Sequence, residues 1–261
     1  MLHLAAKLRG RIRDRKPVLG HLLRTPAPEL VEVAATTGLD FITLDTEHAA
    51  FGPRELEMCL LAARAARLPA LVRTPDGAAP AIQQALDLGA SGIIVPHVGD
   101  DFTLRKSIDA TRLGPKGSRG FSTSHRAAGY GSIPAGEFMA RNNESIIVIA
   151  QIEDRAGLNN IETLAQVADL DAMFIGRADL ACALDETSIH APSVEAAADR
   201  ILDAGRRHAR CTGVFLPTVN ELATMHARGA TFFMVGTDQG LLAAALKHSV
   251  ETFMGCVHEN G

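Results

Sequence analysis

Short apolar runs alternate with longer amphipathic segments along the whole chain. The runs are apolar at consecutive positions, which is typical of strands covered on both faces, as in a parallel sheet. They lie at 18–20, 41–44, 70–72, 92–95, 146–149, 173–175, 213–216 and 232–235. The helical segments follow them at about 28–37, 53–66, 78–88, 101–112, 156–168, 193–209, 219–228 and 238–254. Eight βα units in one register predict an α/β fold, a closed (β/α)8 TIM barrel, rather than an open doubly wound sheet.

One segment interrupts this rhythm. Residues 113–143 are rich in Gly, Ser and Arg, and we expect them to form a long, shaped loop. Long loops in compact domains are mostly functional or disordered. No low-complexity linker divides the 261 residues, which fit one barrel of roughly 250 residues, so we predict a single domain over 1–261.

The first 17 residues are basic and amphipathic. They lack the apolar core of a secretory signal, and their scarcity of acidic residues leaves a transit peptide as an alternative. We favour an N-terminal helix that caps the barrel.

Charge and composition exclude several classes of partner. Lys and Arg number 26 against 30 Asp and Glu, a net charge of −4, which is too mild to indicate nucleic acid or a membrane surface. No apolar run approaches the roughly 18 residues of a membrane span. The four Cys have no zinc-like spacing. A reduced, cytoplasmic protein that acts on small molecules is the simplest interpretation.

Polar residues follow five consecutive predicted strands. Because the carboxyl ends of parallel strands meet at one face of a barrel, and active sites lie there, we expect these residues to converge. They are Asp45 to His48, Arg73 with Thr74, His97 after Pro96, Gln151 with Glu153, and Gly176 to Asp179.

Glu153 and Asp179 are candidate metal ligands. Two carboxylates with open coordination positions suit Mg²⁺, Mn²⁺ or Co²⁺. Gln151 shares the face of Glu153, because side chains alternate along a strand. The structural alternative makes Asp179 the N-cap of a short helix and Glu153 a surface acid.

Three other residues suggest acid–base and electrostatic chemistry. Arg73 could hold a carboxylate or an enolate oxygen, or instead belong to a structural ion-pair network. Asp45 and His48 are three residues apart, so they form either an oriented general base or a helix-start cap. His97 is expected only to line the pocket.

The sequence also lacks several catalytic signatures. There is no dinucleotide fingerprint, Walker A sequence or nucleophile elbow. No Lys ends a predicted strand, so a Schiff-base mechanism has no candidate residue, and a metal is the favoured electrophile. The backbone N–H groups at 176–178, which lead into a helix, could bind an anion.

Six stretches in family order resemble the HpcH/HpaI aldolases, the metal-dependent class II pyruvate aldolases. They are 38–48 (GLDFITLDTEH), 71–74 (LVRT), 88–96 (LGASGIIVP), 114–120 (GPKGSRG), 151–153 (QIE) and 174–180 (FIGRADL). The resemblance spans about residues 16 to 255.

The resemblance implies a role for each matched residue. Glu153 and Asp179 hold the metal, which pyruvate chelates, with Gln151 beside it. The backbone of Gly176, Arg177 and Ala178 receives the carboxylate of pyruvate. Arg73 stabilises the enolate oxygen, and His48 with Asp45 belongs to the proton relay. The family is typically hexameric, with a C-terminal helix, here about 238–254, exchanged between subunits.

The chain departs from the family pattern at Arg177, where Pro is usual. This Arg could recruit an acidic substrate or be turned out to the surface. The stretch 122–127 (STSHRA) resembles the sugar-acid branch of the family, and we expect Arg126 to meet the far end of a substrate. The main prediction is a reversible aldolase releasing pyruvate and an acidic or polyhydroxylated aldehyde. The alternatives are a citrate-forming or thioester-using enzyme and a non-catalytic carboxylate-binding oligomer.

Overall fold

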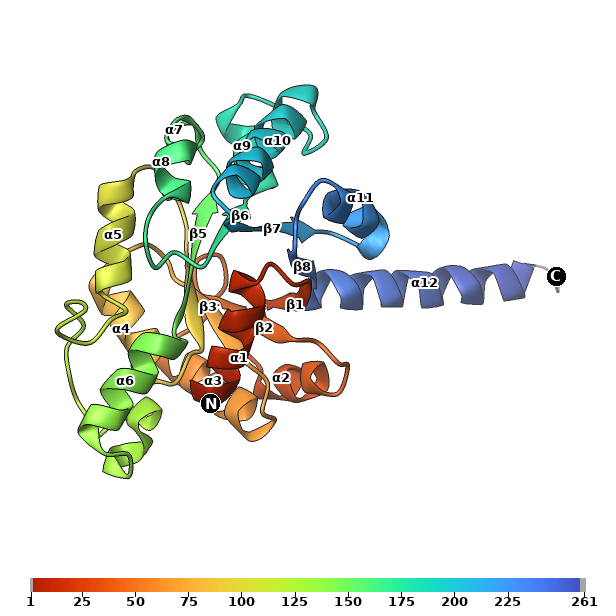
Figure 1. The fold of residues 1–261 in the computed structure, drawn as a ribbon. Helices are drawn as coiled ribbons and strands as arrows, with labels where there is room; N and C mark the ends of the chain where they lie inside the picture. The colour runs from red at the N-terminus through yellow and green to blue at the C-terminus, as the bar shows by residue number, and fades with distance from the viewer. Residues whose placement is uncertain (1, 259–261) are drawn as a thin grey trace.

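The eight predicted strands form a closed parallel barrel in the order β1 to β8 (Figure 1). The computed structural model describes residues 2–258. The strands are β1 (Val18–Leu23), β2 (Phe41–Asp45), β3 (Ala70–Arg73), β4 (Gly92–Val95), β5 (Ile147–Ile152), β6 (Ala172–Ile175), β7 (Cys211–Leu216) and β8 (Phe232–Thr237). Each pairs in parallel with its neighbours, and β8 closes on β1. The predicted (β/α)8 barrel is confirmed.

Helices surround the barrel close to the predicted positions. They are α2 (Pro28–Ala35), α3 (Pro53–Ala65), α4 (Ala79–Asp87), α5 (Asp101–Asp109), α7 (Arg155–Asn159), α8 (Ile161–Ala165), α9 (Arg177–Ala183), α10 (Pro192–Arg207), α11 (Leu222–Ala227) and α12 (Asp238–His258). The helix expected at 156–168 is divided into α7 and α8 at Asn160. The one expected at 219–228 begins as a 3-10 turn, η2 (Val219–Glu221).

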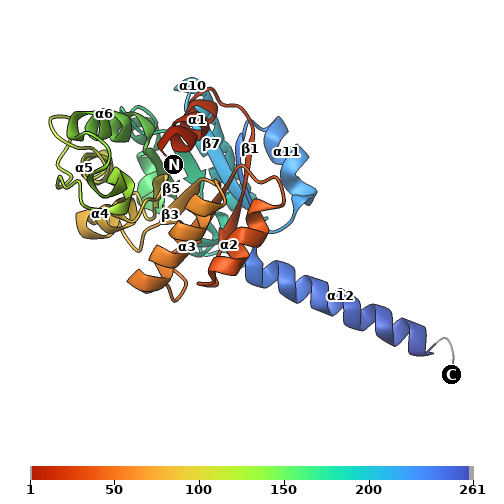
Figure 2. The same cartoon turned by 90° about the horizontal axis from the view of Figure 1, so that it is seen from below.

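The N-terminal segment forms a helix, α1 (Leu2–Arg13), and it caps the barrel as predicted. Leu8 and Ile12 are buried and join the cluster of side chains inside the barrel. Burying both side chains removes apolar surface from water. This stabilises the fold by roughly 1.5–3 kcal/mol for each fully buried side chain. Arg9 also holds the helix in place, because its Nε donates a hydrogen bond to Asp171 Oδ1 at 2.9 Å. The view from below shows α1 lying across the strands (Figure 2).

The expectation of an uninterrupted loop over 113–143 is wrong. The segment contains a 3-10 turn, η1 (Arg126–Gly131), and a helix, α6 (Ala135–Ser145). Phe138, Asn142 and Ser145 are buried at spacings of four and three residues, which is a helical face. Gly and polar residues between them mask this face in the sequence. The loop proper is therefore confined mainly to 110–125.

The last helix differs from the others in its surroundings. The 21-residue α12 leaves the barrel after β8 and extends away from it (Figures 1 and 2). Over the described residues, no helix combines the length and apolar character needed to cross a membrane.

Candidate active site

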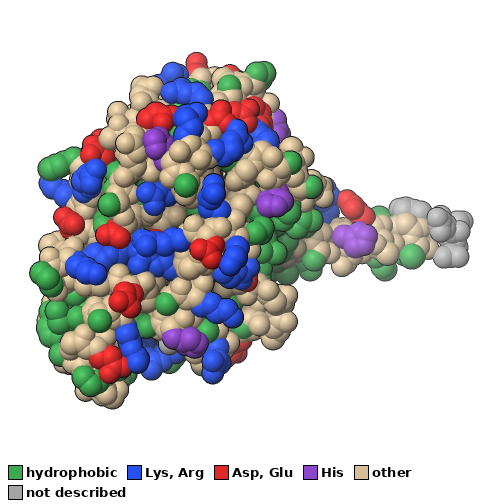
Figure 3. Space-filling view, viewed as in Figure 1, with side chains coloured by type: hydrophobic (Ala, Val, Ile, Leu, Met, Phe, Trp, Pro, Cys, Tyr) green, Lys and Arg blue, Asp and Glu red, His purple; other side chains and the backbone are tan. Residues whose placement is uncertain are grey.

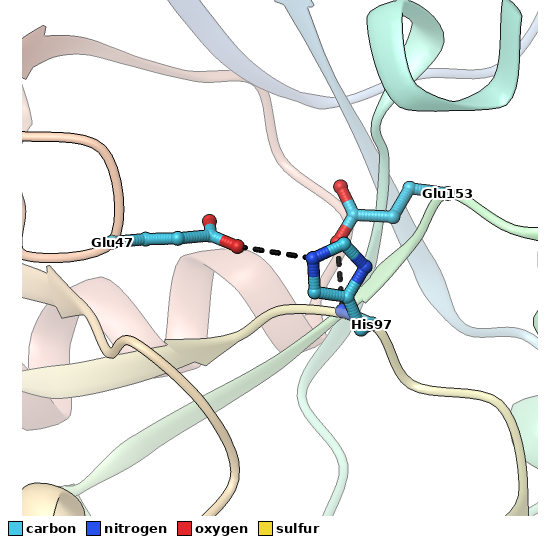
Figure 4. Close-up of side chains that lie close together, drawn as sticks. All are labelled: Glu47, His97 and Glu153. Atoms are coloured by element: carbon cyan, nitrogen blue, oxygen red, sulfur yellow. Dashed lines mark hydrogen bonds and ion pairs between the residues drawn. The ribbon is translucent and has the colours of Figure 1, made fainter. Parts of the chain in front are cut away.

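Three ionisable side chains meet at the carboxyl ends of β2, β4 and β5 (Figure 4). His97 lies between two carboxylates, with its Nε2 3.2 Å from Glu47 Oε1 and its Nδ1 3.3 Å from Glu153 Oε1. Its backbone N–H also donates to Glu153 Oε1 at 2.7 Å. The backbone of His97 is left-handed, with φ +51°, which is uncommon for a non-glycine residue. The chain thus bends sharply after Pro96 and brings the imidazole over Glu153.

Glu153 is the most deeply buried acid of this group. Only 2 % of the residue is exposed, so it is not the surface acid of the structural alternative. Burial raises the pKa of its carboxyl, hydrogen bonds from Gln151 and from the His97 backbone oppose that rise, and the charge of Asp179 adds to it. Burial likewise raises the pKa of Glu47 against the charge of Arg73. Two adjacent carboxyls with raised pKa values favour a positive partner between them.

Buried oxygens without a hydrogen-bond donor lie in the same region, around Glu153. Gln151 donates its Nε2 to Glu153 Oε2, which leaves Gln151 Oε1 buried without a hydrogen-bond partner among the described residues. Glu47 Oε2 is also buried and accepts no hydrogen bond from a described residue, and its one close cation is Arg73, whose Nε lies 3.2 Å away. Glu47, His97 and Glu153 offer ligand atoms that all lie within 4.8 Å of one another. Hard oxygen donors with one imidazole fit a divalent cation.

Asp179 reaches this region from the turn after β6. It lies in the first turn of α9 and is not its N-cap, since Gly176 occupies that position. A Cβ at Gly176 would lie 2.6 Å from Glu153 Oε2 and 2.7 Å from its Cβ. Only glycine therefore allows the turn to approach Glu153 so closely.

Arg73 is held rigidly by Asp45. Its Nε donates to Asp45 Oδ1 at 3.0 Å and its Nη2 to Oδ2 at 2.8 Å, while Nε also lies 3.2 Å from Glu47 Oε2. Burial raises the pKa of Asp45, but the hydrogen bonds and charge of Arg73 outweigh it, and the net pKa is lowered. The structural ion-pair network expected for Arg73 is therefore present, and it holds the guanidinium in one orientation at the barrel end.

His48 stands half-exposed at the mouth of the site. Its backbone N–H donates to Asp45 Oδ1 at 3.2 Å, so Asp45 fixes the turn that carries the imidazole. The ring Nε2 lies 3.7 Å from Glu47 Oε2, which makes Glu47 the acid closest to the ring.

A pocket of about 300 Å³ opens beside these groups. Most of the predicted site residues line it, namely His48, Arg73, Gln151, Gly176, Arg177, Ala178 and Asp179. Its remaining wall is largely apolar and includes Leu22, Phe174, Phe215, Pro217 and Met234.

The two basic residues predicted to contact substrate, Arg177 and Arg126, lie in different places. Arg177 lines the pocket but is only 3 % exposed, and its Nη1 donates to Glu221 at 2.7 Å, so it is not turned out to the surface. Arg126 lies elsewhere: it donates to Glu57 at 2.6 Å and lines a different cavity. Arg126 is thus not brought to this pocket in its own chain.

Sequence reasoning gave no role to Glu47 and only a lining role to His97. Glu47 is two residues after Asp45, so the alternation of side chains along a strand places both on the same face. This spacing is the signal in the sequence that indicates Glu47. For His97 the bend after Pro96 decides the direction of the ring, and the sequence carries no mark of it.

Known proteins resemble this chain over nearly its whole length. The family described as HpcH/HpaI aldolase/citrate lyase matches residues 22–245. A 5-keto-4-deoxy-D-glucarate aldolase from Klebsiella pneumoniae is 31% identical over 227 residues, covering 87% of this chain and 88% of that protein. The corresponding aldolase from Salmonella paratyphi C is 29% identical over 95% of this chain and 96% of its own length.

Solved structures agree with this assignment. An HpcH/HpaI aldolase/citrate lyase family protein from Burkholderia cenocepacia superposes with a TM-score of 0.90 at 28% identity, covering 95% of this chain and 99% of that one. The citrate synthase SbnG has a TM-score of 0.87 at 31% identity, covering 96% and 98%. The chain belongs to the HpcH/HpaI aldolase/citrate lyase family, and the prediction of a carbon–carbon lyase is confirmed.

Proposed function

We propose that this protein is a divalent-metal-dependent aldolase that reversibly cleaves 4-hydroxy-2-oxo acids to pyruvate and an aldehyde. One observation carries the proposal. Buried Glu153, with a raised pKa, lies beside an unpartnered oxygen of Gln151, at the same barrel end as Arg73. This arrangement combines a place for a cation with a fixed positive charge.

The proposed metal ligands are Glu153 and Asp179, with Gln151 beside them. His97 contacts the other oxygen of Glu153, and Glu47 contacts the far side of the His97 ring, so these two residues complete the polar surroundings. Bound Mg²⁺, Mn²⁺ or Co²⁺ would polarise the ketone of the substrate and lower the free energy of the enolate.

Arg73 supplies positive charge where the enolate oxygen develops. Its two hydrogen bonds to Asp45 fix the guanidinium before substrate arrives, so little reorganisation accompanies the reaction. The Gly176 N–H donates to the Ile152 carbonyl, so the backbone N–H groups of Arg177 and Ala178, in the first turn of α9, receive the carboxylate of pyruvate at the same end of the pocket. The apolar wall opposite them excludes water from the reacting carbons.

His48 is the proposed general base. It removes the proton of the 4-hydroxyl group in cleavage and returns it in condensation, from a half-exposed position at the mouth. Asp45 holds its backbone, and Glu47 lies closest to its ring.

The aldehyde portion extends toward the mouth of the pocket. Two basic residues, Arg24 and Arg177, line the same pocket, which favours an aldehyde bearing a carboxylate or several hydroxyl groups. The curated relatives named as 5-keto-4-deoxy-D-glucarate aldolases support such a sugar-acid substrate. We place the enzyme in the cytoplasm as a single-domain subunit of a homo-hexamer, with α12 exchanged between subunits.

A second candidate function is a citrate-forming condensation. The likeness to the citrate synthase SbnG, at 31% identity, favours it. It predicts product from oxaloacetate and an acetyl thioester, and no pyruvate release from hydroxy-oxo acids.

The deciding experiment is a pyruvate-release assay over a panel of 4-hydroxy-2-oxo acids, with Mg²⁺, Mn²⁺ or Co²⁺ added. We expect turnover that EDTA abolishes and metal restores, because among the described residues no Lys lines the pocket to activate the ketone. Glu153→Gln should lose turnover and bind metal more weakly by calorimetry.

Two results would contradict the aldolase. Full activity in EDTA would show that the reaction does not depend on a metal. An adduct with pyruvate that borohydride traps would show a Schiff-base mechanism instead. Formation of citrate without pyruvate release would assign the second function instead.

A further inference from the structure

A second cavity lies at the opposite end of the barrel. Its volume is about 200 Å³, and its lining includes Ser91 and Ile146, which immediately precede β4 and β5. Leu2 and His3 of α1 close it from below, and η1 and α6 close it from the side. The active-site residues follow the same strands at their other ends, so the two cavities are separated by the barrel core.

The cavity is rich in positive charge. Arg64, Arg126 and Arg141 line it together with His3. Arg126 pairs with Glu57, and Arg141 pairs with Glu137. Within residues 2–258, Arg64 has no carboxylate at ion-pair distance, and its Nη1 donates to the Arg126 carbonyl at 3.1 Å. One guanidinium thus remains without a counter-charge at the rim.

Two buried polar atoms in the lining residues lack partners. Ser91 is 2 % exposed, and its Oγ forms no hydrogen bond with any described residue. Arg126 Nε is likewise buried and without an acceptor in the described part of the chain. Buried donors are nearly always satisfied in folded proteins, so these two indicate that an acceptor belongs in the cavity.

The rest of the lining is apolar. Leu60 comes from α3, Leu86 from α4 and Leu88 from the turn after α4. Ile133 lies between η1 and α6, and Ile146 immediately precedes β5. A ligand that satisfies both parts needs an anionic end and a short apolar body. The volume suits a molecule of about the size of a branched short-chain acid.

We propose that this cavity is a second binding site, separate from the reaction, for a small organic carboxylate with an apolar body. Arg126 and Arg64 bind the carboxylate, and the hydroxyl of Ser91 donates a hydrogen bond to it. The leucines surround the apolar part. This gives Arg126, which the active-site pocket does not contain, a ligand-binding function. The bound ligand would contact α1, α3, α4 and η1 at the same time.

The test is isothermal titration calorimetry with 4-methylpentanoate, done in saturating pyruvate and Mn²⁺ so that the active site is occupied. We expect saturable binding, one ligand per chain. Arg64→Met and Arg126→Met should each weaken it about tenfold or more, and Ser91→Ala about threefold. Arg105→Met, on the exposed face of α5, is the matched control and should leave binding unchanged.

Two further ligands define the chemistry. The uncharged 4-methylpentanamide and inorganic phosphate should each bind at least about tenfold more weakly than the acid. Equal binding of the amide would overturn the anion site, and equal binding of phosphate would overturn the apolar part.

The site itself would be overturned by no saturable binding up to about 10 mM. It would also be overturned by binding that appears only in a parallel titration without pyruvate, or by binding that is unchanged in Arg64→Met. Arg64 has no ion pair with a described residue, so its variant keeps the test decisive if Arg126→Met fails to fold.

Discussion

Asp45 is completely buried, yet the hydrogen bonds and charge of Arg73 lower its pKa. Arg73 supplies two hydrogen bonds, and the backbone N–H groups of Glu47 and His48 supply weaker ones at 3.3 and 3.2 Å. Four donors around one carboxylate offset its loss of hydration, which explains the lowered pKa. Asp45 thereby fixes both the guanidinium and the turn that carries His48.

The charges around His48 follow from this arrangement. Because Asp45 is saturated by Arg73 and the backbone, it does not contact the imidazole. Glu47, whose pKa is raised by burial, is the acid nearest the ring, and it also approaches His97. A chain of Glu47, His97 and Glu153 therefore connects the proposed base to the proposed metal ligand.

Replacing His48 tests its role as base. His48→Ala should lower kcat by about 10²–10⁴-fold, or roughly 3–5 kcal/mol of transition-state stabilisation. Metal affinity should stay near that of the wild type, because His48 is neither one of the proposed ligands, Glu153 and Asp179, nor a member of the Glu47, His97 and Glu153 cluster. The measurements are steady-state kinetics and calorimetric titration with Mn²⁺.

The matched control is His208→Ala, a histidine that follows α10, pairs with Glu162 and lines neither cavity. It should retain full turnover. If His48→Ala loses metal together with activity, His48 is a ligand and its assignment as base is wrong.

At the scale of elements, the turn from β6 into α9 is supported by Arg177. The usual Pro of this family would fix the turn through its ring, whereas here the guanidinium does so through distant contacts. Arg177 bonds Glu221 of η2 and approaches the Phe215 carbonyl at 3.3 Å, so it ties α9 to the connection after β7.

Replacing Glu221 tests this tie. Glu221→Gln should lower the free energy of unfolding by about 1 kcal/mol, since Glu221 is partly exposed. The hydrogen bond from Arg177 lowers the pKa of Glu221, so its contribution is present above the unfolded-state pKa of about 4.3 and is lost as the pH falls through the folded value. Urea unfolding at several pH values should show the two proteins converging in acid.

Glu32→Gln, on the exposed face of α2, is the control and should match the wild type at every pH. A difference between Glu221→Gln and wild type that persists unchanged well below pH 4 would show that the carboxylate of Glu221 is not the stabilising group.

The strands and the site residues at their ends could be predicted, and the loops that connect them could not. Fully buried strands such as Ile147–Ile152 carry consecutive apolar residues, and in a closed barrel their ends must converge. The orientation of Arg126 depends instead on η1 and α6, whose packing is tertiary. Phe138, Asn142 and Ser145 form the buried face of α6, and Gly and polar neighbours conceal its periodicity.

At the scale of the whole molecule, α12 leaves a large apolar surface uncovered. Its exposed side chains are Leu241, Leu242, Leu246, Val250, Phe253, Met254 and Val257. Most are three or four residues apart, so they form a stripe along one face. Figure 3 shows apolar side chains gathered where this helix leaves the barrel. Stripes of this size on soluble chains mark interfaces, which is the physical basis of the proposed subunit exchange.

Breaking the stripe should dissociate the proposed hexamer. Leu242→Asp combined with Leu246→Asp places two charges where two leucines, each 58% or more exposed in the single chain, would be buried. Each buried Leu contributes roughly 1.5–3 kcal/mol, so losing two should weaken assembly by several orders of magnitude. Light scattering after size exclusion should show smaller species, while circular dichroism keeps the barrel signal because α12 lies outside the core. His248→Asp, on the opposite face of α12, is the control and should remain assembled. A wild-type monomer, or a double variant with unchanged mass, would show that this stripe does not hold the subunits together.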